Sequence, residues 1–143
     1  MRPKFEFLEH LADAYVAARG RSLEEAFENA ALAMFDVMTD TQKVESRIRD
    51  EIIVEEHDQM ALLYSWLERL LLKFEIERNL YSRFEVGKIL QTDKSWRLHA
   101  TIFGERFDPT KHVSRVEIKA VTYHQMEIGR EDDGYLLKFI LDL

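Results

Sequence analysis

The chain has 143 residues, of which 46% are hydrophobic and 33% charged, and it contains no cysteine. This length and composition fit one compact domain over residues 1–143, and they exclude wholesale disorder, disulfides and thiolate metal sites. The formal net charge of −7 argues against a broad nucleic-acid-binding face, because phosphate contacts require clustered cations. No apolar run is long enough to cross a bilayer, so we expect a cytoplasmic protein without a membrane partner.

The first part of the chain predicts two strands followed by a helix. Phe5, Phe7 and the segment 15–17 indicate strands on either side of a short connection. Ser22 and Glu25 have the spacing of a capping box, which marks the start of a helix. After them an apolar residue recurs every three or four positions, which predicts one buried stripe: Leu23, Phe27, Ala30, Met34 and Met38.

A strand over residues 43–56 and a second helix follow. Asp58 is the expected N-cap of that helix, and Asn79 is its expected C-terminal cap. The helix carries an apolar stripe with a similar spacing: Leu63, Leu67, Leu70 and Phe74, widened by Trp66 and Leu71. We expect both stripes to be buried against the sheet, while Glu28 and Glu68 stay exposed to solvent.

The remainder of the chain is typical of β-structure. Apolar and polar residues alternate over residues 96–102, 116–120 and 135–141, which predicts strands with one buried face. A turn is predicted at residues 92–94 and a hairpin loop at residues 129–134. These elements predict an α+β fold: a single two-layer domain in which two main helices pack on a mixed β-sheet of about six or seven strands.

The sequence contains none of the motifs that mark common enzyme classes. There is no nucleophile elbow, phosphate-binding glycine loop, pair of histidines at helical zinc-ligand spacing or dinucleotide fingerprint. The five histidines are dispersed, and surface exposure or core packing explains each of them more simply than metal ligation.

Two carboxylates stand out by their context. Asp13 lies in a short connection between apolar segments, where a turn role would also explain it. Asp142 ends the last predicted strand beside the carboxylate of Leu143, where a frayed terminus is the simpler explanation. Clustered carboxylate oxygens suit a hard cation such as calcium, magnesium or manganese. The sequence alone does not place Asp13 beside Asp142.

Four stretches of the chain resemble the archease family, and together they cover nearly its whole length. They are Glu9–Asp13, the predicted helix Ser22–Met38, the segment with Gly104-Glu105 and Asp108–His112, and the run Lys119-Ala120-Val121-Thr122-Tyr123-His124 with the closing Asp142. The last stretch is the most specific, because a capped amphipathic helix is generic.

The resemblance implies a small α+β protein cofactor rather than an enzyme. Archeases act on the tRNA-splicing RNA ligase, so it implies that this protein promotes guanylylation and multiple turnover of that ligase. It also implies a metal site at Asp13, Asp142 and Leu143, with calcium as the expected ion. Lys119 and His124 lie in the family's signature and are a second tier of residues for ligase activation.

Two positions beside Asp13 depart from the family pattern. Leu11 stands where the family usually has threonine, and Ala14-Tyr15 stands where it has an Ile-Gly pair. Leu11 removes a hydroxyl that could order the loop or its waters, and Tyr15 puts a bulky ring in place of the smallest residue. These departures concern the metal site rather than the fold.

Other interpretations stay open at this point. A chaperone-like binding module for other RNA- or DNA-modifying proteins is the main alternative function. A small hydrolase with His124 as base and Asp13 as its orienting group is less favoured, because no nucleophile motif accompanies them. Lys119 has a simple alternative as an outward-facing lysine of a strand, since it alternates with Ile118 and Ala120.

Overall fold

The computed structural model describes residues 3–8 and 13–143 of the chain. These residues form nine strands and two main helices in the order β1 (Phe5–Leu8), β2 (Asp13–Gly20), α1 (Leu23–Met38), β3 (Ile48–Glu56), α2 (Gln59–Leu72), β4 (Asn79–Val86), β5 (Leu90–Gln91), β6 (Trp96–Arg106), β7 (Ala120–Val121), β8 (Glu127–Glu131) and β9 (Gly134–Asp142). A short 3-10 helix, η1 (Thr41–Lys43), follows α1, and one π-helical turn, η2 (Lys73–Glu77), extends α2.

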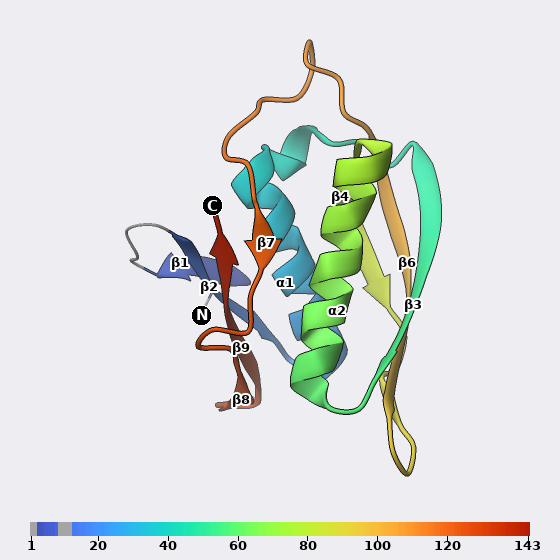
Figure 1. Cartoon of the computed structure of the whole chain (residues 1–143), viewed down its shortest axis with the longest axis vertical. Coiled ribbons are helices and arrows are strands. Elements are labelled where there is room, and N and C mark those ends of the chain that lie inside the picture. The colour runs from blue at the N-terminus through green and yellow to red at the C-terminus, as the bar shows by residue number, and fades with distance from the viewer. Residues whose placement is uncertain (1–2, 9–12) are drawn as a thin grey trace.

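The two helices lie between two sheets (Figure 1). The first sheet has the strand order β1-β2-β9-β7, and β8 also pairs with β9. The second has the order β3-β6-β4, and β5 also pairs with β6. Each helix contacts strands of both sheets, so the core is formed at the helix–sheet interfaces on both sides. No helix in the described part of the chain is long and apolar enough to span a membrane.

The predicted α+β class with two main helices packed on β-sheet is confirmed, but the layering differs. The strands of the described residues divide into two sheets instead of one, and all their pairings are antiparallel. The helices are therefore the middle layer of three. Alternation along a strand identifies one buried face, but it does not say which sheet the strand joins, so the sequence could not separate the two sheets.

The predicted cap at the start of α1 forms, with one difference. The Ser22 hydroxyl accepts a hydrogen bond from the Glu25 amide at 3.0 Å, as expected. The Glu25 carboxylate accepts from the amide of Arg21 at 2.8 Å, so the reciprocal bond lies one residue earlier than in a capping box. The side-chain amide of Asn29 donates to the carbonyl of Arg19 at 2.6 Å, which ties α1 to β2.

The predicted stripes are buried except at one end. Four of the side chains expected in the core are fully buried: Phe27, Met34, Leu63 and Leu67. The helices are also joined by a hydrogen bond, because the indole of Trp66 donates to the carbonyl of Phe27 at 3.0 Å. Phe74 is only half-buried, since it lies in η2, where the π-helical turn changes the direction in which side chains project.

The prediction that Glu28 and Glu68 stay exposed is wrong, because both are half-buried. The Glu28 carboxylate accepts from the amide of Val86 at 2.8 Å, and burial raises the pKa of Glu28. Glu68 accepts from the hydroxyl of Tyr64 at 3.0 Å. A helix with a sheet on each side has a narrower solvent face than a helix on one sheet, and the apolar spacing could not reveal this.

Two predicted boundaries also differ from the structure. The strand expected from residue 43 begins at Ile48, because the chain first forms η1. The second helix ends at Arg78, whose φ of 60° is left-handed and whose amide donates to the carbonyl of Phe74 at 2.9 Å. Asn79 therefore starts β4 and does not cap the helix.

The strand predicted over residues 116–120 is largely replaced by an extended crossover, and pairing begins only at Ala120 in β7. The crossover instead covers the C-terminus of α1. The amides of Arg115 and Val116 donate to the carbonyls of Met38 and Val37 at 2.9 and 3.2 Å. Carbonyl groups at a helix C-terminus lack partners within the helix, so this contact satisfies two of them.

Leu67→Ala should lower the free energy of unfolding by about 2–5 kcal/mol, because a fully buried leucine loses its transfer energy and leaves a cavity. Leu72 lies on the same helix and is 39% exposed, so Leu72→Ala is the matched control and should cost clearly less. Urea denaturation followed by circular dichroism measures both. Equal losses in the two variants would contradict the burial of this face of α2.

Candidate functional site

The first sheet brings Asp13 and Asp142 together. Asp13 is the first residue of β2 and Asp142 is the last residue of β9, and the antiparallel register pairs them directly. Residues that are directly opposite in such a pair project to the same face, with Cβ atoms about 4.5–5.5 Å apart. Both residues are half-buried. Two carboxylate side chains therefore share one face at one end of the sheet, which we call the strand-end site.

The end of the chain packs against the core at this site. Leu143 is partly buried and contacts the core. On the other side of β9, Ala120 of β7 pairs with Asp142. The amide of Lys119 donates to the carbonyl of Asp142 at 2.7 Å. The ends of β2, β9 and β7 thus meet here, and Figure 1 shows the C-terminus beside β7.

The donors at the strand-end site are hard oxygen atoms. Carboxylate oxygens such as those of Asp13 and Asp142 are ligands that calcium, magnesium and manganese accept, and calcium best tolerates irregular geometry. Within residues 3–8 and 13–143, no three His, Asp or Glu side chains form a group that could hold a metal ion. The two aspartates would therefore need the Leu143 carboxylate or backbone oxygens to complete a cation site.

Part of the N-terminal resemblance cannot be placed. Residues 9–12, which include His10 and the departure at Leu11, lie outside the described residues. Tyr15, the other departure, is half-buried in β2 opposite Ile140 of β9. The larger ring is therefore accommodated within the paired strands, two residues from Asp13.

The two second-tier residues lie in different surroundings. The side chain of Lys119 is exposed, and its backbone bond to Asp142 holds it at the strand-end site. His124 is exposed in the turn after β7, and the Gln125 side-chain amide lies 3.5 Å from its Nε2. Among the described residues, the hydrogen-bond partner of the His124 ring is Gln125. The hydrolase hypothesis requires Asp13 in that place, so this contact does not support it.

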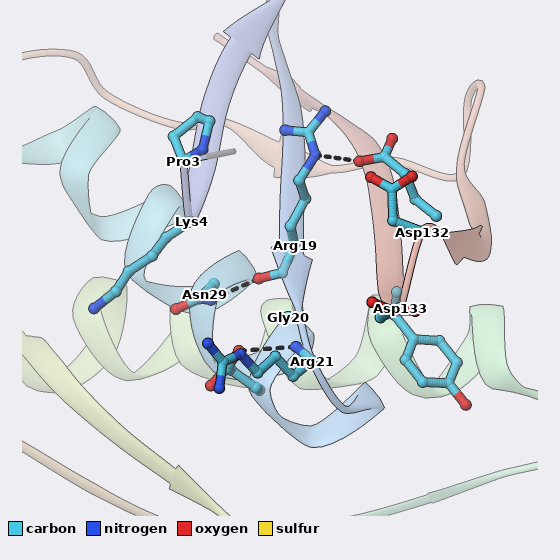
Figure 2. Close-up of a pocket in the computed structure, with 12 residues that line it drawn as sticks. Pro3, Lys4, Arg19, Gly20, Arg21, Asn29, Asp132 and Asp133 are labelled. Atoms are coloured by element: carbon cyan, nitrogen blue, oxygen red, sulfur yellow. Dashed lines mark hydrogen bonds and ion pairs between the residues drawn. The ribbon is translucent and has the colours of Figure 1, made fainter. Parts of the chain in front are cut away.

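A cavity of about 740 Å³ lies at the opposite end of β2 (Figure 2). Two of the lining side chains, Arg19 and Glu131, form an ion pair. Arg19 Nε donates to Glu131 at 2.7 Å, and Arg19 Nη1 lies 2.9 Å from a carboxylate oxygen of Glu6. Asp132 and Asp133 also line the cavity and lie across Arg19 from Pro3 and Lys4 in Figure 2. This cavity has no side chain in common with the strand-end site.

A buried polar cluster, which the sequence did not identify as a unit, centres on Glu105 and His112. His112 Nε2 lies 2.9 Å from Glu105 Oε2, and His112 Nδ1 accepts from the amide of Asp108 at 2.9 Å. Both side chains are buried. A ring nitrogen that accepts an N–H bond carries no proton, so His112 is neutral and donates from Nε2 to the carboxylate. Core packing, one of the two explanations expected for the histidines, applies to His112.

Glu105 is held by several donors. Burial opposes its ionisation, but the amide of Glu45 at 2.8 Å, the ammonium of Lys111 at 2.8 Å and His112 lower the pKa of Glu105 to about 2. Arg47 Nε adds an ion pair at 3.3 Å. The cluster anchors the start of the crossover that leads to the strand-end site. Only the proximity of these residues in the fold, and not their spacing, reveals the cluster.

The chain matches the model of the Archease protein family over residues 5–143. A "Protein archease" of Sulfurisphaera tokodaii is 46% identical over 140 residues, which cover 98% of this chain and 99% of the relative. The relative of the same description in Pyrococcus abyssi is 45% identical over 131 residues, or 92% of each chain.

Solved structures have the same fold. The solution structure of Methanobacterium thermoautotrophicum protein 1598 gives a TM-score of 0.86 at 46% identity, covering 98% of this chain and 99% of that chain. The crystal structure of a Thermotoga maritima protein, described as an archease and possible chaperone, gives a TM-score of 0.63 at 20% identity. It covers 100% of this chain and 98% of that chain, and its likeness concerns the fold.

Stability should fall when acid protonates Glu105. Its pKa of about 2 lies below the ordinary value of 4.5, so the ionised carboxylate stabilises the fold above that value, and this contribution is lost as the pH falls toward 2. The loss is at most about 3 kcal/mol. Urea unfolding midpoints, measured from about pH 6 to about pH 2.5, should decline less steeply in Glu105→Gln than in the unchanged protein.

Glu55→Gln is the control for this experiment, because Glu55 is an exposed carboxylate on β3. It should keep the pH dependence of the unchanged protein. An equal decline in the unchanged protein and in Glu105→Gln would contradict the anchoring role of Glu105.

Proposed function

The chain belongs to the archease family, and we propose that it acts as a non-catalytic protein cofactor of the tRNA-splicing RNA ligase. In this role it promotes guanylylation of the ligase and lets the ligase turn over repeatedly. One observation carries the proposal: Asp13, Asp142 and the backbone of Lys119 meet at the strand-end site. These residues belong to separate stretches of the chain that each resemble the family, so their meeting supports a shared role.

We propose that the strand-end site holds a divalent cation, with calcium as the first candidate. The register of β2 and β9 sets the spacing of Asp13 and Asp142, and Leu143, which follows Asp142 in the chain, packs against the core. Three carboxylates drawn together repel one another, so the site favours a positively charged ligand. When bound, the ion would supply positive charge toward an anionic group of the ligase or of its nucleotide.

Lys119 would act together with this site. Its side chain is exposed, and its backbone amide bonds to the carbonyl of Asp142. The ammonium would therefore be available near the strand-end site to a phosphate or an acidic side chain of the ligase. His124, in the turn after β7, would extend the same surface with an imidazole that can donate or accept a hydrogen bond. The net charge of −7 supports contact with a protein rather than a grip on RNA.

One observation favours a second function. The Thermotoga maritima relative in fold is described as a possible chaperone. The alternative is therefore a chaperone-like modulator of other RNA- or DNA-modifying proteins. Affinity purification from native extract separates the two functions. Recovery of the RNA ligase supports the first, and recovery of methyltransferases without the ligase supports the second.

The proposed function predicts that multiple-turnover ligation, measured with limiting ligase, increases when this protein is added. Asp13→Asn and Asp142→Asn should each reduce that increase in ligation. Each should also weaken calcium binding about tenfold or more, because it removes the negative charge of a ligand while keeping a side chain of similar size. Calorimetric titration with calcium and the ligation assay measure the two effects. Circular dichroism should show an unchanged fold.

Asp133→Asn is the matched control, since Asp133 is exposed in the turn between β8 and β9, at the other end of β9. It should bind calcium and activate the ligase like the unchanged protein. Equal ligation with and without the protein would refute the proposed function. Activation that survives while calcium binding is lost would refute only the part assigned to the cation.

Lys119→Ala should reduce ligase activation without changing the unfolding midpoint, because the side chain is exposed and only its backbone contacts Asp142. Lys94→Ala, in the turn between β5 and β6, is the control and should activate normally. Unchanged activation by Lys119→Ala would leave Lys119 as an ordinary outward-facing lysine.

A further inference from the structure

Two tyrosine rings stack on the outer side of α2. The rings of Tyr64 and Tyr123 are nearly parallel, with centroids 4.3 Å apart and an angle of 5° between their planes. Tyr64 lies on α2, and Tyr123 lies in the turn after β7, which runs beside α2 in Figure 1. Tyr123 is 51% exposed although Tyr64 covers one of its faces. About half of Tyr123 therefore remains accessible to a partner.

Three carboxylates lie on α2 and on the segment that leads into it. Glu56 ends β3, Asp58 caps α2, and Glu68 lies one turn beyond Tyr64 and accepts a hydrogen bond from its hydroxyl at 3.0 Å. Burial, and then the negative charges of these three carboxylates, raise the pKa of the Tyr123 hydroxyl. The exposed tyrosine therefore lies near net negative charge.

The fold does not neutralise these charges with its own basic side chains. Glu56 accepts from the hydroxyl of Ser65 at 2.7 Å, and Asp58 lies 3.0 Å from Nε2 of His57, an exposed histidine. Among the described residues, no lysine or arginine forms an ion pair with Glu56, Asp58 or Glu68. These carboxylates near the exposed ring thus accept hydrogen bonds but have no lysine or arginine partner among the described residues.

Elsewhere the molecule covers aromatic faces with its own arginines. The guanidinium carbon of an arginine lies over a ring centroid at distances of 4.3, 4.5 and 4.6 Å in three pairs: Arg78 with Phe74, Arg83 with Phe103, and Arg130 with Tyr135. Within the described part of the chain, Tyr123 receives no such cation. Tyr123 is thus an exposed aromatic ring with no arginine of the described residues over it.

We propose that Tyr123, backed by Tyr64, is a binding site for an arginine side chain of a partner protein. A guanidinium stacks flat on an aromatic ring, and nearby carboxylates attract its positive charge. A lysine ammonium lacks the flat face, and the phosphates of RNA or nucleotides are repelled by the carboxylates. The chemistry of the site therefore favours arginine over both.

This inference goes beyond the proposed function and does not depend on it. The site is formed by α2 and the turn after β7, whereas the candidate cation ligands lie at the ends of β2 and β9. Arginine binding can be measured without any ligase. Absence of arginine binding would not contradict the proposed activation of the ligase. Absence of ligase activation would not contradict arginine binding at Tyr123.

The test titrates the full chain with N-acetyl-arginine amide and follows the tyrosine ring resonances by NMR. The rings of Tyr64 and Tyr123 should shift in a saturable way, and N-acetyl-lysine amide should bind about two- to fivefold more weakly. Tyr123→Phe keeps the ring and should keep binding. Tyr123→Leu keeps an apolar side chain but loses the ring, and should weaken binding about fivefold or more.

Charge variants complete the test. Glu68→Gln and Glu56→Gln should each weaken binding, and raising the salt concentration should have the same effect. Glu55→Gln, on the same strand as Glu56 but not among the groups that act on Tyr123, should not. The proposal is overturned if N-acetyl-arginine amide causes no resonance shifts, or if the shifts are spread over the whole surface. It is also overturned if the shifts persist in Tyr123→Leu. Tighter binding of adenosine monophosphate than of arginine at Tyr123 overturns it in favour of a nucleic-acid partner.

Discussion

The pairing of β2 with β9 is the contact on which most of the molecule depends. It joins residues 13–20 to residues 135–142 through eight consecutive pairs, and so links the two ends of the chain in one sheet. Val16 and Ala18 of β2 and Leu137 of β9 are completely buried against the helices. A slip of one residue would turn these side chains to the other face of the sheet. The same slip would separate Asp13 from Asp142, so core packing and the strand-end site are specified by one register.

A close contact between glycines helps to hold this register at the far end of the strands. A Cβ atom built on Gly134 would lie 2.3 Å from the carbonyl oxygen of Gly20. No side chain fits at that distance, so the hairpin between β8 and β9 can approach the end of β2 only because residue 134 is glycine. The β2–β9 pair is thus closely packed at the end with Gly20, and it carries two carboxylates at the end with Asp13 and Asp142.

Local features of the fold were predictable from the sequence, and long-range ones were not. The caps at Ser22 and Asp58 and the apolar spacing of both helices depend on residues within one or two turns, and the structure has them. The division into two sheets and the burial of Glu28 depend on which layer a strand joins, which alternation does not encode. The meeting of Asp13 with Asp142 depends on a register between distant segments.

The resemblance to the family filled part of this gap, because it named residues that the physical analysis could not bring together. It pointed to Asp13, Asp142 and Lys119, whose backbones the structure places side by side. It also contained Glu105 and His112, but without a role. In the structure, their buried bond fixes the start of the crossover that ends at Lys119. The position of Lys119 therefore depends on the buried Glu105–His112 bond as well as on its own backbone bond to Asp142.

The place of β9 has a consequence for biosynthesis. This strand lies between β2 and β7 in the first sheet, yet it follows all the other described strands in chain order, so a ribosome produces it after them. The second sheet draws its strands from residues 48–106 and can pair earlier, whereas β1 and β2 must wait for β9 as an incomplete sheet. During that interval the nascent chain presents an unpaired strand edge and the apolar face of α1, features that promote aggregation. The first sheet, and with it the strand-end site, can therefore form only after β9 has been synthesised and has left the ribosome.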